Sequence, residues 1–203
     1  MRILGIDPGS RLTGYGCVDL IGDQVRHVTH GTLKLSATHG KSTVPLEERL
    51  LLIHQGLSEV IREFRPKIMA IEKVFFAKNA VSALKLGQAR GAAILTGMIH
   101  GLSIVEYSPN EVKQSVVGQG HADKEQVARM VQILTGVKEF ETSDASDGLA
   151  LAICHAHHIG KTGVVASASG GTAAEGLAQA LQSASGRRSK KRMSLAEAVG
   201  LKK

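Results

Sequence analysis

Apolar and polar positions divide the first 35 residues into three predicted strands. Residues 2–7 form a short apolar run, which indicates a buried strand. Residues 13–22 and 24–35 alternate between apolar and polar side chains, and a tight turn around Gly22-Asp23 is expected to join them. Three strands connected in succession predict an antiparallel meander.

From residue 46 onward the pattern changes to helices and strands in alternation. Residues 46–64 carry apolar side chains at helical spacing, and Pro66 follows just beyond the expected helix end. The further predicted elements are a strand at 67–74, a helix at 79–100, a strand at 103–107 and helices at 123–134 and 144–158. Because strands followed by helices connect as parallel crossovers, we expect an α/β fold with a mixed sheet: three antiparallel strands, then parallel strands, flanked by helices.

Carboxylates occupy the ends of three of these elements. Asp7 ends the first strand, Glu72 ends the strand at 67–74, and Asp144 and Asp147 open the last helix at a spacing that places both on one face. Since α/β folds build their sites at strand ends, we expect the four acids to converge. Four like charges repel unless cations are present, and oxygen ligands without Cys or His favour Mg²⁺ or Mn²⁺.

Each acid also has a simpler interpretation when it is taken alone. Asp7 precedes Pro8-Gly9 and suits a turn, and Glu72 suits a salt bridge. Asp144 and Asp147 suit a helix start, where the macrodipole favours negative charge. The occurrence of all four at the ends of three separate segments favours the metal site.

Charge and composition divide the chain into two parts. The net charge of +7 is uneven, because residues 1–159 contribute +1 and residues 160–203 contribute +6. The second part is rich in Gly, Ala and Ser, so we expect one folded domain over 1–159 and a basic, disordered tail over 160–203. Two cysteines far apart in sequence and the lack of a long apolar run indicate a cytoplasmic protein without a disulfide or membrane span.

Five segments together carry a resemblance to a known family. They read GIDPGSRLTGYG (5–16), AIEKVFFAKNA (70–80), SALKLGQARG (82–91), VKQSVVGQGHADKEQV (112–127) and DASDGLALAI (144–153). The chain resembles the RuvC family of Holliday-junction resolvases, which have an RNase H-like fold. The resemblance implies that Asp7, Glu72, Asp144 and Asp147 are catalytic acids binding two Mg²⁺ or Mn²⁺ ions. It also implies paired hydrolytic cuts in four-way junction DNA that leave 5′-phosphate and 3′-hydroxyl ends. The resemblance places this activity in DNA recombination and repair.

The resemblance extends to residues that would hold DNA and to partners. It implies that Phe75 wedges between bases and that Lys113 and Lys124 lie near the scissile phosphate. The simpler alternatives are a phenylalanine packed under the sheet and lysines that only add solubility. The resemblance also implies a homodimer formed partly through the small-residue segment 87–101, and a branch-migration helicase complex of the RuvA and RuvB type as partner.

Other functions remain open on the sequence alone. GIDPGS at 5–10 also resembles the phosphate loop of sugar-kinase or actin-like ATPases, which need a second nucleotide-binding domain that 203 residues do not supply. A related RNase H-like nuclease acting on ribosomal RNA precursors is another alternative, and a non-catalytic nucleic-acid module is a third. Two segments depart from the family pattern, since the loop at 36–45 and the basic tail are both longer.

Overall fold

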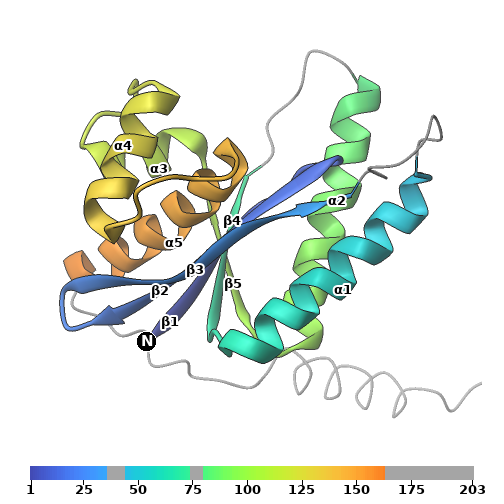
Figure 1. Ribbon diagram of the computed structural model, residues 1–203, viewed down its shortest axis with the longest axis horizontal. Coiled ribbons are helices and arrows are strands. Elements are labelled where there is room, and N and C mark those ends of the chain that lie inside the picture. Colours follow the sequence, from blue (N-terminus) through green and yellow to red (C-terminus); the bar gives the residue numbers. More distant parts are fainter. Residues whose placement is uncertain (36–43, 74–79, 163–203) are drawn as a thin grey trace, which may run out of the picture. The chain divides into compact units, whose positions relative to one another are not determined.

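The computed structural model of the protein describes residues 1–35, 44–73 and 80–162 (Figure 1). Within these residues the strands are β1 (Arg2–Asp7), β2 (Leu12–Ile21), β3 (Gln24–Lys34), β4 (Ile68–Glu72) and β5 (Ser103–Tyr107). The helices are α1 (Leu46–Phe64), α2 (Ala80–Ile99), α3 (Pro109–Val117), α4 (Lys124–Thr135) and α5 (Ser143–Thr162). The predicted tail lies outside the described residues from residue 163 onward.

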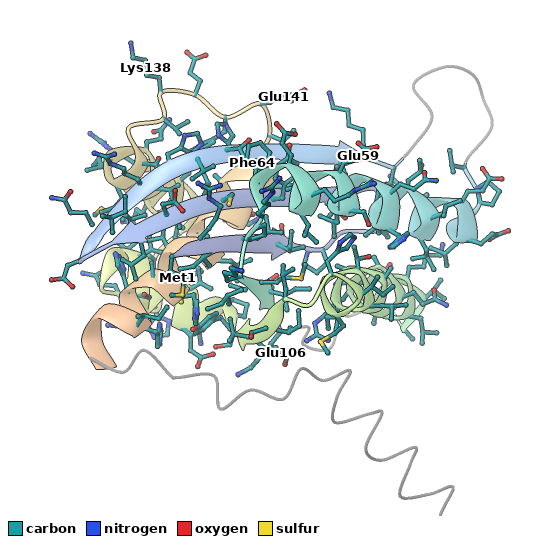
Figure 2. The ribbon with its side chains drawn as sticks, turned by 90° about the horizontal axis from the view of Figure 1, so that it is seen from below. Met1, Glu59, Phe64, Glu106, Lys138 and Glu141 are labelled. Carbon is teal, nitrogen blue, oxygen red and sulfur yellow. The ribbon has the colours of Figure 1, made fainter. Side chains whose placement is uncertain are left out.

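The strands of the described part form one mixed sheet in the order β3-β2-β1-β4-β5. β1 pairs antiparallel with β2 and parallel with β4, while β2–β3 is antiparallel and β4–β5 parallel. Figure 2 shows Glu141 beside the β3 edge and Glu106 at the opposite, β5 edge. The predicted mixed α/β sheet, with a meander followed by parallel crossovers, is confirmed.

Helices cover both faces of the sheet (Figure 1). Neighbouring residues of β1 point to opposite faces: Ile3 packs with the core residues of α5, and Leu4 packs with those of α1 and α2. Each fully buried side chain of this size contributes about 1.5–3 kcal/mol of hydrophobic free energy. Burial on both faces explains why β1 is an almost continuous apolar run, as is usual for central strands in such folds.

Glycines allow α5 to lie directly on β1 and β2. A Cβ atom on Gly14 would stand 1.9 Å from the backbone oxygen of Asp144, and one on Gly5 would stand 2.0 Å from that of Gly148. A methyl group at either position would therefore push the helix away from the sheet. These two contacts set the height of α5 and place its first turn at the edge where β1 ends.

The structure adds one helix that the sequence analysis did not predict. α3 begins after Ser108, whose hydroxyl accepts a bond from the Glu111 backbone N–H while the Glu111 carboxylate binds the Ser108 N–H. This capping box, with Pro109 in the first turn, stabilises a helix of 9 residues. α5 also continues to Thr162, beyond the predicted end at His158.

None of the helices within the described residues is both long and apolar enough to cross a membrane.

Candidate active site

Asp7 and Glu72 lie at the same edge and on the same face of the sheet. Their strands are adjacent and parallel, and the last registered pair of the two strands, Ile6 and Ile71, comes one residue before each acid. Side chains alternate along a strand, so Asp7 shares the face of Gly5, against which α5 packs. Glu72 shares the face of Ala70, which belongs to the α5 side of the core. Both carboxylates therefore extend from the sheet towards α5.

Asp144 and Asp147 approach this edge from α5. Asp144 is the second residue of the helix, and its backbone contacts Gly14, the residue of β2 that pairs with Asp7. Ala145 and Gly148 are buried beneath the helix, whereas the two acids are only partly buried. The structure thus brings together all four acids that the sequence analysis singled out.

Burial and mutual repulsion change the proton affinity of the strand acids. Burial raises the pKa of Asp7 to about 8, and the negative charges of Glu72, Asp147 and Asp144 contribute to this rise. The pKa of Glu72 is also raised, first by burial and then by Asp147. Burial and nearby like charges both favour the protonated form of a carboxyl group and so raise its pKa. The four acids therefore need a positive charge from outside their own group.

Lys124 supplies the countercharge in this structure. Its ammonium lies 3.2 Å from the Asp147 carboxylate, at the first residue of α4. Asp147, and more weakly Asp7 and Asp144, raise the pKa of Lys124. Asp123 caps α4 and its N–H binds the Gln126 side chain, so the helix start that carries Lys124 is held in place. Lys124 thus lies beside the acids, while its contact with the scissile phosphate, which the resemblance implied, stays a prediction.

The turn after Asp7 is held by contacts from two sides. Thr13 is buried, and its hydroxyl donates to the Gly9 carbonyl at 3.1 Å. From α1, the Arg49 guanidinium donates to the Ser10 carbonyl at 2.8 Å. The backbone directly following Asp7 is therefore fixed on both sides, which limits the positions available to its carboxylate.

Comparison with known proteins identifies the family. Residues 3–155 match the family described as "Crossover junction endodeoxyribonuclease RuvC". The chain belongs to the RuvC family. A RuvC of Geobacter sulfurreducens is 55% identical over 157 residues, covering 77% of this chain and 93% of the relative. A RuvC of Dichelobacter nodosus is 50% identical over 158 residues, covering 78% of this chain and 86% of the relative.

Solved structures agree with this assignment. The structure described as "T. thermophilus RuvC in complex with Holliday junction substrate" matches with a TM-score of 0.72 and 36% identity, over 80% of this chain and 96% of that chain. The yeast mitochondrial Holliday junction resolvase Ydc2 matches with a TM-score of 0.53 at 15% identity, which shows a shared fold. The predicted RNase H-like architecture is confirmed.

RuvC family nucleases depend on a metal, and the donor set here suits one. The site offers carboxylate oxygens and no Cys or His, which is the ligand chemistry of hard cations. Within the described part of the chain, no three Asp, Glu, His or Cys side chains stand close enough to hold an ion jointly. A bound cation would therefore have to draw the mutually repelling carboxylates inward.

The remaining residues predicted to contact DNA are less well placed by the structure. Lys113 lies in α3, and among the described residues its ammonium makes no ion pair. Phe75 lies outside the described residues, between the end of β4 and the start of α2. Their roles at the DNA stay predictions.

Two basic residues that hold the end of β4, one next to the strand and one on α2, were missed by the sequence analysis. The Lys73 ammonium lies 3.6 Å from the Glu111 carboxylate, which ties the end of β4 to α3. Arg90 of α2 donates from Nε to the Glu72 backbone carbonyl at 3.0 Å. The available signal for Arg90 was its charge in a helix of mostly small and apolar residues, in which Lys85 is the other charged residue.

Proposed function

We propose that this protein makes paired cuts in four-way DNA junctions by metal-dependent phosphodiester hydrolysis. The reaction would serve DNA recombination and repair. One observation carries the proposal: four carboxylates from β1, β4 and α5 of a RuvC-family fold meet at one sheet edge, where burial and mutual repulsion raise the pKa of Asp7 to about 8. Carboxylates gathered at such cost in free energy need cations as partners. A RuvC of the same fold is described in complex with a Holliday junction substrate.

Two ions would be held by the four acids Asp7, Glu72, Asp144 and Asp147. Mg²⁺ or Mn²⁺ is expected, because each acid offers only oxygen atoms as ligands. When bound, such ions supply an activated water and stabilise the leaving 3′ oxygen. Lys124 stands beside the acids, where its ammonium can contact the scissile phosphate. Lys113 would contact a more distant phosphate, and Phe75 would stack between bases near the crossover. Products would carry 5′-phosphate and 3′-hydroxyl ends.

We propose a homodimer that pairs through α2. The outer face of this helix exposes large apolar side chains, with Leu84, Leu95 and Ile99 exposed by 69%, 60% and 62%. Gly87 and Gly91 leave open space beside them, which lets another helix approach closely. A twofold dimer presents two equal sites, as two symmetric cuts in a junction require.

The same proposal includes a cellular setting. A resolvase of this family would act in the cytoplasm, together with a branch-migration helicase complex of the RuvA and RuvB type. Cys17 and Cys154 are both buried free thiols, in keeping with a reducing compartment.

Single-turnover nicking of a labelled four-way junction with Mg²⁺ tests the proposal. Duplex DNA and an RNA duplex of equal length serve as competing substrates, and the 5′-phosphate is checked by ligation of the nicked product. Paired, ligatable nicks confined to the junction are expected. Preferential cutting of RNA would indicate a nuclease for RNA precursors, and ATP hydrolysis without nicking would indicate an ATPase; either result contradicts the proposal.

A further inference from the structure

Arg90 connects α2 to the ends of two neighbouring strands. Its Nε–H donates to the backbone carbonyl of Glu72 at 3.0 Å, and its Nη2 forms an ion pair with the Glu106 carboxylate of β5. The Arg90 side chain is only 20% exposed, whereas the Glu106 side chain is 42% exposed, so the bond to the Glu72 carbonyl is the better protected of the two. Glu106 is labelled at the edge of the sheet in Figure 2.

The contact reaches Glu72 from the face opposite to α5. Ile104 packs with the α1 and α2 side of the core, and Glu106, two residues later on the same strand, shares that face. Glu72 thus extends its carboxylate towards α5, while its backbone is held by a side chain of α2. Arg90 contacts the acidic strand end without entering the acidic site.

In the described residues the sheet pairs Glu72 with β5 but not with β1. In the described residues the β1–β4 pairing ends at Ile6 and Ile71, one residue before Glu72. On the other side, the Lys73 N–H donates to the Tyr107 carbonyl at 2.8 Å. The β5 side is therefore bonded by the sheet, and the Arg90 guanidinium satisfies the Glu72 carbonyl where the pairing with β1 has ended.

We propose that Arg90 is a positioning residue for the acidic site: it fixes the backbone of Glu72 so that the carboxylate stays within reach of a cation despite repulsion from its neighbours. The inference rests on the proposed function, because it assigns Arg90 to the same metal site. Glu72 ends its strand beside other acids, and like charges would push a loose strand end away from them. Outer partners of metal ligands act in this way, by orienting the groups that bind the ion.

The guanidinium is suited to this task in a way that an ammonium is not. Its planar fork donates in two fixed directions at once, here to a carbonyl of β4 and a carboxylate of β5. Lysine retains the charge beside Glu106 but lacks the second, rigidly placed donor. Arg90→Lys therefore removes the hold on Glu72 while the ion pair with β5 is preserved.

The test compares Arg90→Lys with a matched control, Arg62→Lys. Arg62 also donates from Nε to a backbone carbonyl, that of Ser58 at 3.1 Å, but lies on α1 away from the acids. Calorimetry with Mn²⁺ alone measures ion binding to the DNA-free protein, and single-turnover nicking is measured over a range of Mn²⁺ concentrations. Junction affinity is measured without metal.

Arg90→Lys is expected to weaken Mn²⁺ binding by about 10-fold and to slow nicking at saturating Mn²⁺ by about 10- to 100-fold, the usual effect of removing an outer partner of a ligand. Junction affinity should stay within about twofold, because phosphate contacts elsewhere hold the DNA. Arg62→Lys should change none of the three. Glu106→Gln, which loosens the guanidinium without removing it, should shift Mn²⁺ binding in the same direction by less.

The outcomes separate this inference from the proposed function. Wild-type protein that binds Mn²⁺ and nicks junctions, beside an Arg90→Lys variant with equal Mn²⁺ affinity, overturns the role of Arg90 alone. Wild-type protein that neither binds Mn²⁺ nor nicks overturns the proposed function. If Arg90→Lys fails to fold, Glu106→Gln decides: unchanged Mn²⁺ affinity in that variant overturns the inference.

Discussion

The ammonium of Lys124 lies 3.2 Å from the carboxylate of Asp147, so a basic residue expected at the phosphate neutralises a predicted catalytic acid in this structure. The two residues come from different helices, α4 and α5. Lys124 also lowers the pKa of Asp7 and Glu72, opposing the rise that burial and the other acids cause. A cation held by these acids would compete with Lys124 for Asp147.

Lys124→Met should slow single-turnover nicking by at least about tenfold, since under the proposed function it removes the positive charge that would contact the reacting phosphate. The free energy of unfolding should change by no more than about 1 kcal/mol, because the Lys124 side of the ion pair is exposed to solvent. Lys138→Met, at an exposed lysine of the α4–α5 loop (Figure 2), is the matched control and should nick normally. Normal nicking by Lys124→Met would remove it from the site.

Neutral substitutions of the acids should separate cutting from binding. Asp7→Asn, Glu72→Gln and Asp147→Asn should each reduce nicking by at least about 100-fold, because each removes a charged ligand of the ions. Junction affinity measured by gel shift should be retained, since phosphate contacts hold the DNA. Asp23→Asn, at the exposed β2–β3 turn, serves as control. Near-normal cutting by any of the three variants would contradict the assignment of that acid.

His155 should make the stability of the protein depend on pH. Burial lowers its pKa from 6.5 to about 4, with a smaller contribution from the charge of His158. Its Nδ1 is bonded to the Tyr107 hydroxyl at 2.7 Å, and in the described residues its buried Nε2 has no hydrogen-bond partner. The unfolded chain takes up the proton at higher pH than the folded protein, so the free energy of unfolding should fall between pH 6.5 and 4.

The decrease due to His155 over this range should be about 2–3 kcal/mol. Urea unfolding of wild type and His155→Leu at several pH values measures it, and the variant should show the smaller dependence on pH. His121→Leu, at an exposed histidine, should behave as wild type. Parallel curves for wild type and His155→Leu would contradict the prediction.

A charge on the outer face of α2 should disrupt the proposed dimer. Leu95→Glu is expected to weaken self-association at least about tenfold, because an unpaired carboxylate would be buried at the centre of the interface. Sedimentation equilibrium at micromolar concentrations measures the effect. Ile133→Glu on α4 alters a side chain of similar exposure, 68% against 60%, and should leave the dimer intact. Wild-type protein that stays monomeric and binds a junction one to one would exclude the proposed dimer.

Removal of residues 163–203 should weaken DNA binding without affecting the chemistry. Residues 1–159 have a net charge of only +1, so much of the long-range attraction for DNA would come from the tail. Affinities for junction and duplex should fall alike, and the log–log salt slope should flatten by about 0.9 for each phosphate that the tail neutralises in the full chain. Nicking at saturating protein should not change. Identical salt slopes for the full and truncated chains would rule out a DNA-binding tail.

The pattern of apolar residues was sufficient to predict most of the fold. Two-residue periodicity in 13–22 and 24–35 predicted β2 and β3, and helical spacing in 46–64 predicted α1 with its observed bounds. α3 was missed because 9 residues hold too few turns for a clear periodicity. Its capping box, Ser108 followed by Glu111, was the local signal that could have revealed it.

The sequence by itself determined which acids could meet. Asp7 and Glu72 end apolar strands, and Asp144 and Asp147 open a helix, so local pattern alone placed all four at element ends. Only the tertiary structure decided what surrounds them: the pKa of Asp7, the pairing of Lys124 with Asp147, and the hold of Arg90 on Glu72. These depend on distances and burial among side chains far apart along the chain. Periodicity reports which face a residue occupies, whereas Coulomb energy and hydrogen bonds depend on separations that only packing sets.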